Sequence, residues 1–155
     1  MYISKIAFQK IKEFEGCRLQ AYQDAAGVWT IGYGHTYNVR EGDRISQQQA
    51  DELLEEDIMT VERQLIATHD PKVGRWTKAQ LDAVVCFVFN VGIGRYTKST
   101  LRKAIMQKMP DDKIEKYWRS WCFVNGKKSR GLEKRRNWEL MRFFEESDEW
   151  DKNYE

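Results

Sequence analysis

One stretch near the middle of the chain is apolar on almost every side. Residues 81–92, LDAVVCFVFNVG, leave no continuous polar face for a helix, and Thr77 and Gln80 form a capping box just before them. The run is too short to span a bilayer. We therefore predict a helix buried at the centre of the fold, ended by Gly92 and Gly94, with the rest of the chain packed around it.

Other segments have the pattern of amphipathic helices. Ser4 and Gly16 are expected to cap a first helix at its two ends, which places Glu15 in the last turn. Ser46 and Gln49 form a second capping box and open a helix that continues to about residue 66. Three further helices are expected over residues 98–109, 111–121 and about 132–146.

Residues 18–36 have a different character. The stretches RLQAY and VWTIGYG are rich in β-branched and aromatic residues and flank QDAAG, a pattern typical of a β-hairpin with Gly27 in or beside the turn. Asp24 is expected near the end of the first strand and Thr30 within the second. Residues 125–126, Asn-Gly, predict a second turn.

The length of 155 residues is enough for one domain with its own core. We predict an α+β, mainly helical fold in which residues 1–155 form that domain. Its expected parts are a β-containing lobe over about 13–45, a helical lobe from 1–12 and 67–147, a bridging helix over 46–66 and an acidic tail over 148–155.

Three polar side chains gather around the first hairpin. Glu15 lies at the negative end of a helix dipole, where the dipole and any burial favour the protonated acid. Asp24 is expected to stay ionised on the open hairpin, and the Thr30 hydroxyl can hold a water beside it. Glycoside hydrolysis uses two carboxyls in different protonation states. The structural alternatives are a solvated surface group, a turn former and an ordinary strand residue.

The segment FEGCRLQAYQDAAGVWTIGYGHT resembles the start of the bacteriophage-type lysozymes, the endolysin muramidases of glycoside hydrolase family twenty-four. Their pattern of Glu, eight residues, Asp, five residues, Thr and then Gly-Tyr-Gly-His is met in full from Glu15 to His35. The similarity continues through ISQQQADELLEEDI, FVFNVGIG, STL and GLEKRRNWELMRFF. It implies a two-lobed lysozyme-like fold with the groove between the lobes.

The resemblance also implies a reaction. The substrate would be bacterial peptidoglycan, hydrolysed with inversion at the β-1,4 bond between N-acetylmuramic acid and N-acetylglucosamine, for host cell lysis. Glu15 would be the general acid, Asp24 the carboxylate beside the attacking water and Thr30 its partner. Further substrate-binding positions carry over to Thr36, Phe89 and Thr100.

The few cysteines and histidines suggest neither disulfides nor a metal site. Cys17, Cys86 and Cys122 are odd in number and widely spaced, so we expect them to be reduced and structural. The two histidines lack ligand spacing, so no metal and no cofactor are expected. His35 is expected to make a structural ion pair or hydrogen bond.

The N-terminal residues MYISKIAFQKIKEFEG contain no apolar h-region, so no signal peptide is predicted. The resemblance then implies synthesis in the bacterial host cytoplasm and action on the cell wall after membrane permeabilisation by a separate holin. Peptidoglycan is the expected partner, and we expect a monomer without stable membrane anchoring.

Residues 127–142, KKSRGLEKRRNWELMR, hold seven basic and two acidic residues. A net charge of +2 and the absence of any nucleic-acid-binding motif argue against a nucleic-acid partner. We interpret the segment as a solvated helix face. Two alternatives are a positive surface that favours approach to the anionic wall, and an arginine, Arg135 or Arg136, that pairs with Glu15.

Two other functions compete with hydrolysis. A lytic transglycosylase also uses a glutamate acid but makes an anhydro product, and it needs no base for water, so Asp24 and Thr30 favour hydrolysis. A non-catalytic wall-binding or nucleic-acid-binding module would show no turnover and would keep its function in a Glu15→Gln variant.

Overall fold

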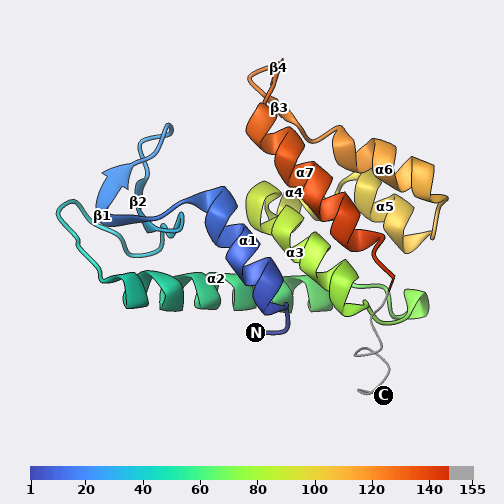
Figure 1. The fold of residues 1–155 in the computed structure, drawn as a ribbon, viewed down its shortest axis with the longest axis horizontal. Helices are drawn as coiled ribbons and strands as arrows, with labels where there is room; N and C mark the ends of the chain where they lie inside the picture. Colours follow the sequence, from blue (N-terminus) through green and yellow to red (C-terminus); the bar gives the residue numbers. More distant parts are fainter. Residues whose placement is uncertain (147–155) are drawn as a thin grey trace.

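The computed structural model describes residues 1–146, so the predicted tail over 148–155 lies outside the described residues. The described part contains seven α-helices and two small antiparallel hairpins, which confirms the α+β, mainly helical prediction (Figure 1). The helices are α1 (Lys5–Glu15), α2 (Gln47–Thr68), α3 (Lys78–Val91), α4 (Ile93–Thr97), α5 (Thr100–Met106), α6 (Asp111–Arg119) and α7 (Arg130–Phe143), with a 3₁₀ turn, η1, at Pro71–Val73. The strands are β1 (Arg18–Gln23), β2 (Trp29–Gly32), β3 (Phe123–Val124) and β4 (Lys127–Lys128).

Helix α3 is the central buried helix that its composition predicts. Residues 82–88 are all buried, and the helix contacts α1, α2, α4 and α7. Gly92 ends it with a φ of 94°, a value that favours glycine. The prediction for Gly94 was wrong, because Gly94 lies inside the short helix α4 that begins just after Gly92.

Aromatic side chains fill the core beside α3. The Phe87 ring meets the Trp118 and Trp121 rings edge-on, with ring centroids 5.6 Å apart in both pairs. Trp118 is fully buried and also packs on Phe143. Edge-on pairs are a favourable arrangement for aromatic rings. Together with the Trp118–Phe143 contact, they join α3, α6 and α7 in the core.

Helix α2 extends beneath both the β1–β2 hairpin and the helical part of the molecule (Figure 1). It contacts β2 in the hairpin and contacts α3 and α4 among the helices. The first hairpin pairs Tyr22 with Thr30 and Gln23 with Trp29, and an irregularity interrupts β1 between Arg18 and Tyr22. Along the described part of the chain, we find no helix that combines the length and apolarity needed to cross a membrane.

Both predicted capping boxes are present. The Thr77 hydroxyl accepts a hydrogen bond from the Gln80 backbone N–H, and the Gln80 side chain accepts one from the Thr77 N–H; Ser46 and Gln49 repeat the arrangement at α2. Each box satisfies two backbone donors that a helix start leaves without partners.

We expect Thr77→Ala to lower the free energy of unfolding by about 1 kcal/mol, because the buried helix α3 loses its cap. Urea denaturation at neutral pH measures the change. Thr60→Ala is the matched control, since the exposed Thr60 hydroxyl donates to the Glu56 carbonyl within α2 and caps nothing. An equal loss of stability in both variants would contradict the prediction.

Candidate active site

Glu15 lies where three distant segments of the chain meet. It is the last residue of α1, and Gly16 turns the chain away with a φ of 66°. Arg135 of α7 donates from Nη1 to Glu15 Oε1 at 2.6 Å. On the other side, a Cβ added to Gly34 would lie 3.7 Å from Glu15 Oε2, so the loop after β2 approaches this carboxyl closely. The Glu15 side chain keeps 21% of its surface exposed and is therefore accessible to a ligand.

Arg135 belongs to a buried network that extends behind Glu15. Its Nη2 donates to the Cys86 carbonyl at 2.9 Å, and its Nε lies 3.4 Å from Glu139. Glu139 is fully buried, pairs with Arg136 at 2.9 Å and accepts a hydrogen bond from the Trp118 indole at 2.8 Å. The network therefore holds Arg135, and through it one oxygen of Glu15, in a defined place.

Burial shifts the pKa values of the charged side chains in this network. Burial raises the pKa of Glu139 above its usual range, although the two arginines and the Trp118 indole act in the opposite direction. Burial alone would lower the pKa of Arg135, but the neighbouring Cys86 thiol and the Glu15 and Glu139 carboxylates leave it above its ordinary value. Arg135 therefore stays a cation beside Glu15.

These contacts decide between the interpretations of the basic segment 127–142. The expected pair between Glu15 and one of the two arginines is confirmed, with Arg135 as the partner. The interpretation as a solvated helix face was wrong for Arg135 and Arg136, which are 4% and 1% exposed. It was also wrong for Arg142, whose guanidinium pairs with the buried Asp82 at 2.8 Å. These three arginines pair with the buried carboxylates of Glu139 and Asp82, and the pairs stabilise the helical core.

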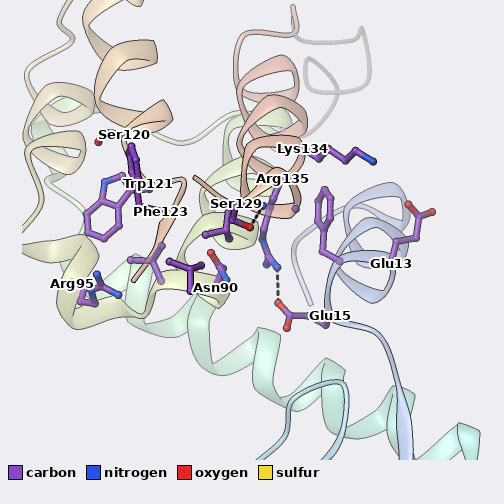
Figure 2. A pocket seen from close by; sticks show the side chains of 15 residues that line it. Glu13, Glu15, Asn90, Arg95, Ser120, Trp121, Phe123, Ser129, Lys134 and Arg135 are labelled. Carbon is purple, nitrogen blue, oxygen red and sulfur yellow. Dashed lines mark hydrogen bonds and ion pairs between the residues drawn. The ribbon is translucent and has the colours of Figure 1, made fainter. Parts of the chain in front are cut away.

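A cavity of about 1020 Å³ opens beside Glu15, and we call it the Glu15 cavity. Figure 2 shows Arg95 and Trp121 at one side, Glu15 and Arg135 at the other, and Asn90 between them. Arg136 donates to Asn90 Oδ1 at 2.6 Å, which leaves the Asn90 amide N–H groups free to donate elsewhere. The remaining lining residues are Glu13, Phe14, Val91, Ser120, Phe123, Val124, Ser129, Gly131, Leu132 and Lys134.

Asp24 and Thr30 lie on the first hairpin, outside the lining of this cavity as the described residues define it. Asp24 is exposed, and its Oδ1 accepts from the backbone N–H groups of Ala26 and Val28, both at 2.9 Å. Thr30 is 4% exposed and donates to the Val28 carbonyl at 2.9 Å. Thr30 pairs with Tyr22, so Asp24 and Thr30 are not opposite each other in the hairpin. Both side chains instead bond to the backbone of Val28: Asp24 accepts from its N–H, and Thr30 donates to its carbonyl.

The predicted substrate-binding residues are spread over the molecule. Thr36 is exposed in the loop after β2, and Thr100 is exposed at the first position of α5. Phe89 is half-buried on α3 and packs against the core. The cavity lining given by the described residues includes none of the three. Their roles stay predictions.

His35 and the three cysteines are not part of the lining of the Glu15 cavity among the described residues. His35 Nδ1 lies 2.8 Å from Asp57 Oδ2 of α2, which confirms a structural pairing for His35. Cys17, Cys86 and Cys122 are all free thiols, as predicted. Cys86 and Cys122 are buried whereas Cys17 is exposed, so burial supports a structural role only for the first two.

Sequence reasoning missed several residues of the site. Asn90, Arg95 and Trp121 line the Glu15 cavity, and none was singled out as a candidate. Asn90 follows Phe89 directly, so one turn of α3 carries both. Glu139 was missed as well, although its spacing of three and four residues from the two arginines is that of ion pairs on one helix face.

Known proteins are similar to this chain in sequence and in fold. The phage lysozyme family matches residues 12–139 of the chain. An endolysin of Acyrthosiphon pisum secondary endosymbiont phage 1 is 45% identical over 105 residues, which cover 68% of this chain and 70% of that protein. The solved muramidase domain of SpmX from Asticaccaulis excentricus superposes with a TM-score of 0.82 at 32% identity, over 92% of this chain and 97% of the other. An endolysin from Escherichia coli O157:H7 phage FAHEc1 gives 0.79 at 30% identity, over 94% of each chain.

Proposed function

Because the chain belongs to the phage lysozyme family, we propose that Glu15, Asp24 and Thr30 are its catalytic residues. Lysozymes are glycoside hydrolases, and the endolysin and muramidase relatives indicate peptidoglycan as the substrate. The bond cut in this proposal is the β-1,4 bond between N-acetylmuramic acid and N-acetylglucosamine, with inversion at the anomeric carbon. The biological role in this proposal is lysis of the bacterial host.

The position of Glu15 is the observation that carries the proposal. One oxygen, Oε1, accepts from Arg135, and the other, Oε2, lies near the backbone of Gly34. Within residues 1–146, Oε2 accepts no hydrogen bond. In the proposed mechanism, Glu15 is the general acid, and a proton on Oε2 passes to the glycosidic oxygen of a strand lying along the Glu15 cavity.

In the proposed mechanism, Asp24 and Thr30 hold the attacking water. The two backbone bonds to Asp24 use Oδ1, so Oδ2 is available to accept a proton from water. The Thr30 hydroxyl donates its own hydrogen to Val28, so its oxygen is left to accept the second hydrogen of the same water. The water oxygen then presents a lone pair to the anomeric carbon. Inversion needs roughly 6.5–9.5 Å between the two carboxyls, with this water in the gap.

Mass spectrometry of a digest of purified peptidoglycan tests the reaction. We expect products that end in reducing N-acetylmuramic acid, because water is the nucleophile. Products with 1,6-anhydro ends would instead establish a lytic transglycosylase and overturn the hydrolytic proposal. Running the digest in ¹⁸O-labelled water adds an independent check, since only hydrolysis places one labelled oxygen at the new reducing end.

Asp24→Asn is expected to lower the rate of peptidoglycan hydrolysis by about 100-fold or more, because the amide cannot take a proton from water. The fold should survive, since the amide oxygen still accepts from the Ala26 and Val28 N–H groups. Asp43→Asn is the matched control: Asp43 also accepts a loop N–H, from Arg40 at 2.8 Å, in the same lobe. Release of dye from labelled cell walls measures both. Equal rates in the two variants would remove Asp24 from the mechanism.

The site of action in this proposal is the cell wall, reached from the host cytoplasm after a separate holin has opened the inner membrane. The proposal further takes the protein to act as a monomer, without nucleic acid and without stable membrane anchoring. Expression in a bacterial host tests the route: the culture should lyse only when a holin is co-expressed or the membrane is opened with chloroform. Lysis on expression of this chain alone would contradict it.

A further inference from the structure

A polar network on α2 joins the two segments that meet at the Glu15 carboxyl. One segment is α1, which ends at Glu15, and the other is the tight turn after β2, whose Gly34 lies near Glu15 Oε2. Two backbone hydrogen bonds of 2.9 Å between Ile31 and His35 close this turn. The place of Glu15 relative to the turn therefore depends on what holds each of the two segments.

Gln47 and Asp51 of α2 hold both segments. Gln47 Nε2 donates to the hydroxyl of Tyr33, which belongs to the turn, and to Asp51 Oδ1, both at 3.0 Å. Lys12 Nζ, one helical turn before the end of α1, lies 3.2 Å from Asp51 Oδ1. We call these four side chains the Asp51 network. Through it, the turn and the end of α1 are attached to the same point on α2.

The contacts of the Asp51 network support one another. Tyr33 is buried, and Lys12 Nζ lies over its ring, 5.5 Å from the centroid, where a cation is attracted to the ring face. Burial alone would lower the pKa of Lys12, but its hydrogen bond to Asp51 leaves that pKa raised. Burial alone would raise the pKa of Asp51, but its hydrogen bonds to Lys12 and Gln47 leave it lowered. Both groups therefore stay charged near neutral pH and keep their ion pair.

A neighbouring pair on α2 has the same spacing without these contacts. Gln48 Nε2 donates to Glu52 at 3.0 Å, four residues along the helix, and both side chains are exposed. Within residues 1–146, neither side chain makes a hydrogen bond or an ion pair outside α2. The two pairs therefore differ in what they reach, and Gln48 and Glu52 are matched controls for Gln47 and Asp51.

We propose that Gln47 and Asp51 are positioning residues for the glycosidase reaction: they fix the Glu15 carboxyl relative to the Gly34 turn and so set the rate of proton transfer to the leaving oxygen. The inference rests on the proposed role of Glu15 as the general acid. Neither residue lines the Glu15 cavity as the described residues define it, so neither should contact substrate there. Because a small misplacement of a catalytic group can cost much of the rate, the network should affect kcat and leave KM nearly unchanged.

Steady-state kinetics on soluble, uncross-linked peptidoglycan strands tests the role of Asp51. Asp51→Ala releases both segments from α2, so we expect kcat to fall about tenfold while KM changes by less than about twofold. Glu52→Ala should keep both constants within about twofold of wild type, because its pair reaches no other element. An unchanged kcat in Asp51→Ala, equal falls in the two variants, or an effect confined to KM would overturn the proposal.

Two milder variants grade the effect. Asp51→Asn keeps an oxygen that accepts from Gln47 and Lys12, so its kcat should lie above that of Asp51→Ala. Gln47→Ala breaks the link to Tyr33 alone and should lower kcat about threefold, the effect of one hydrogen bond. Gln47 is exposed, so this variant keeps the test valid even if Asp51→Ala folds poorly. A kcat equal to that of Gln48→Ala would contradict the proposal.

Combining Asp51→Ala with Glu15→Gln separates positioning from a general loss of structure. A residue that acts through Glu15 should lower the residual rate of Glu15→Gln by less than about twofold, because the acid that it positions is already gone. A fall of about tenfold in both backgrounds would refute the positioning role and leave the proposed function intact. Near wild-type activity of Glu15→Gln alone would instead refute Glu15 as the acid, and this inference with it.

Discussion

Replacing Glu15 with glutamine is expected to reduce peptidoglycan hydrolysis by about 1000-fold or more, within the range of general acid catalysis. Glutamine has no acidic proton to give to the leaving oxygen, so cleavage of the glycosidic bond loses its acid. The fold should be kept, because the amide oxygen can still accept from Arg135 Nη1 in place of the carboxylate oxygen. Dye release from labelled cell walls measures the rate, and circular dichroism follows the melting temperature.

Glu13→Gln is the matched control for this experiment. Glu13 also lines the Glu15 cavity and lies two residues earlier on α1, but it is exposed and pairs with Lys10 at 3.1 Å on the helix surface. Its substitution removes the same charge from the same cavity. We expect at least half of the wild-type rate in Glu13→Gln. Comparable losses in the two variants would show that the charge of the cavity, rather than an acid at Glu15, limits the reaction.

Features encoded within a few adjacent residues could be predicted from the sequence. The capping boxes at Ser46 and Thr77 each depend on a partner three residues away, and both are present. The turn at Asn125 and Gly126 is a local signal too: both residues have positive φ values, 49° and 77°, and join β3 to β4. Such features form from local backbone chemistry, so distant parts of the chain scarcely alter them.

The register of the first hairpin shows where local prediction fails. The composition of residues 18–36 predicts the two strands and the turn, but not how Asp24 bonds within it. Its carboxylate accepts two backbone N–H groups and closes a loop on Val28, which places Thr30 opposite Tyr22. An irregularity between Arg18 and Tyr22 shifts the pairing further. An offset of two residues keeps every side chain on the same face of the hairpin, so it leaves almost no trace in the sequence pattern.

The burial of Arg135 could not be predicted from its own segment. Seven basic residues in sixteen favour a solvated surface, and that rule fails when the partners come from elsewhere in the chain. One partner, Glu15, is 120 residues away, and another, the Cys86 carbonyl, is 49 residues away. The pairing of charge across the core depends on tertiary packing. The local clue, Glu139 on the same helix face, indicates an ion pair but not its burial.

The substitution with the largest expected effect on stability is Glu139→Ala. It leaves Arg135 and Arg136 buried with one fewer counter-charge and removes the acceptor for the Trp118 indole. Breaking a buried ion pair in this way costs about 3–5 kcal/mol. For a chain of this size that is a fall in melting temperature of about 6–20 °C. Glu133→Ala on the same helix, where the nearest cation is Lys128 at 3.9 Å, should change stability by less than about 0.5 kcal/mol.

Glu139→Gln separates the charge of Glu139 from its hydrogen bonds. It keeps an acceptor oxygen, so it should cost less stability than Glu139→Ala.

Burial raises the pKa of Glu139 in the folded state, so the folded protein binds this proton more tightly than the unfolded chain does. The stabilising contribution of protonated Glu139 is complete below the unfolded pKa of about 4.3 and is lost as the pH rises through the raised folded value. Urea denaturation across this window should therefore show the wild-type advantage over Glu139→Gln shrinking as pH increases. An advantage that grows with pH would mean that the arginines stabilise the ionised carboxylate by more than its burial costs.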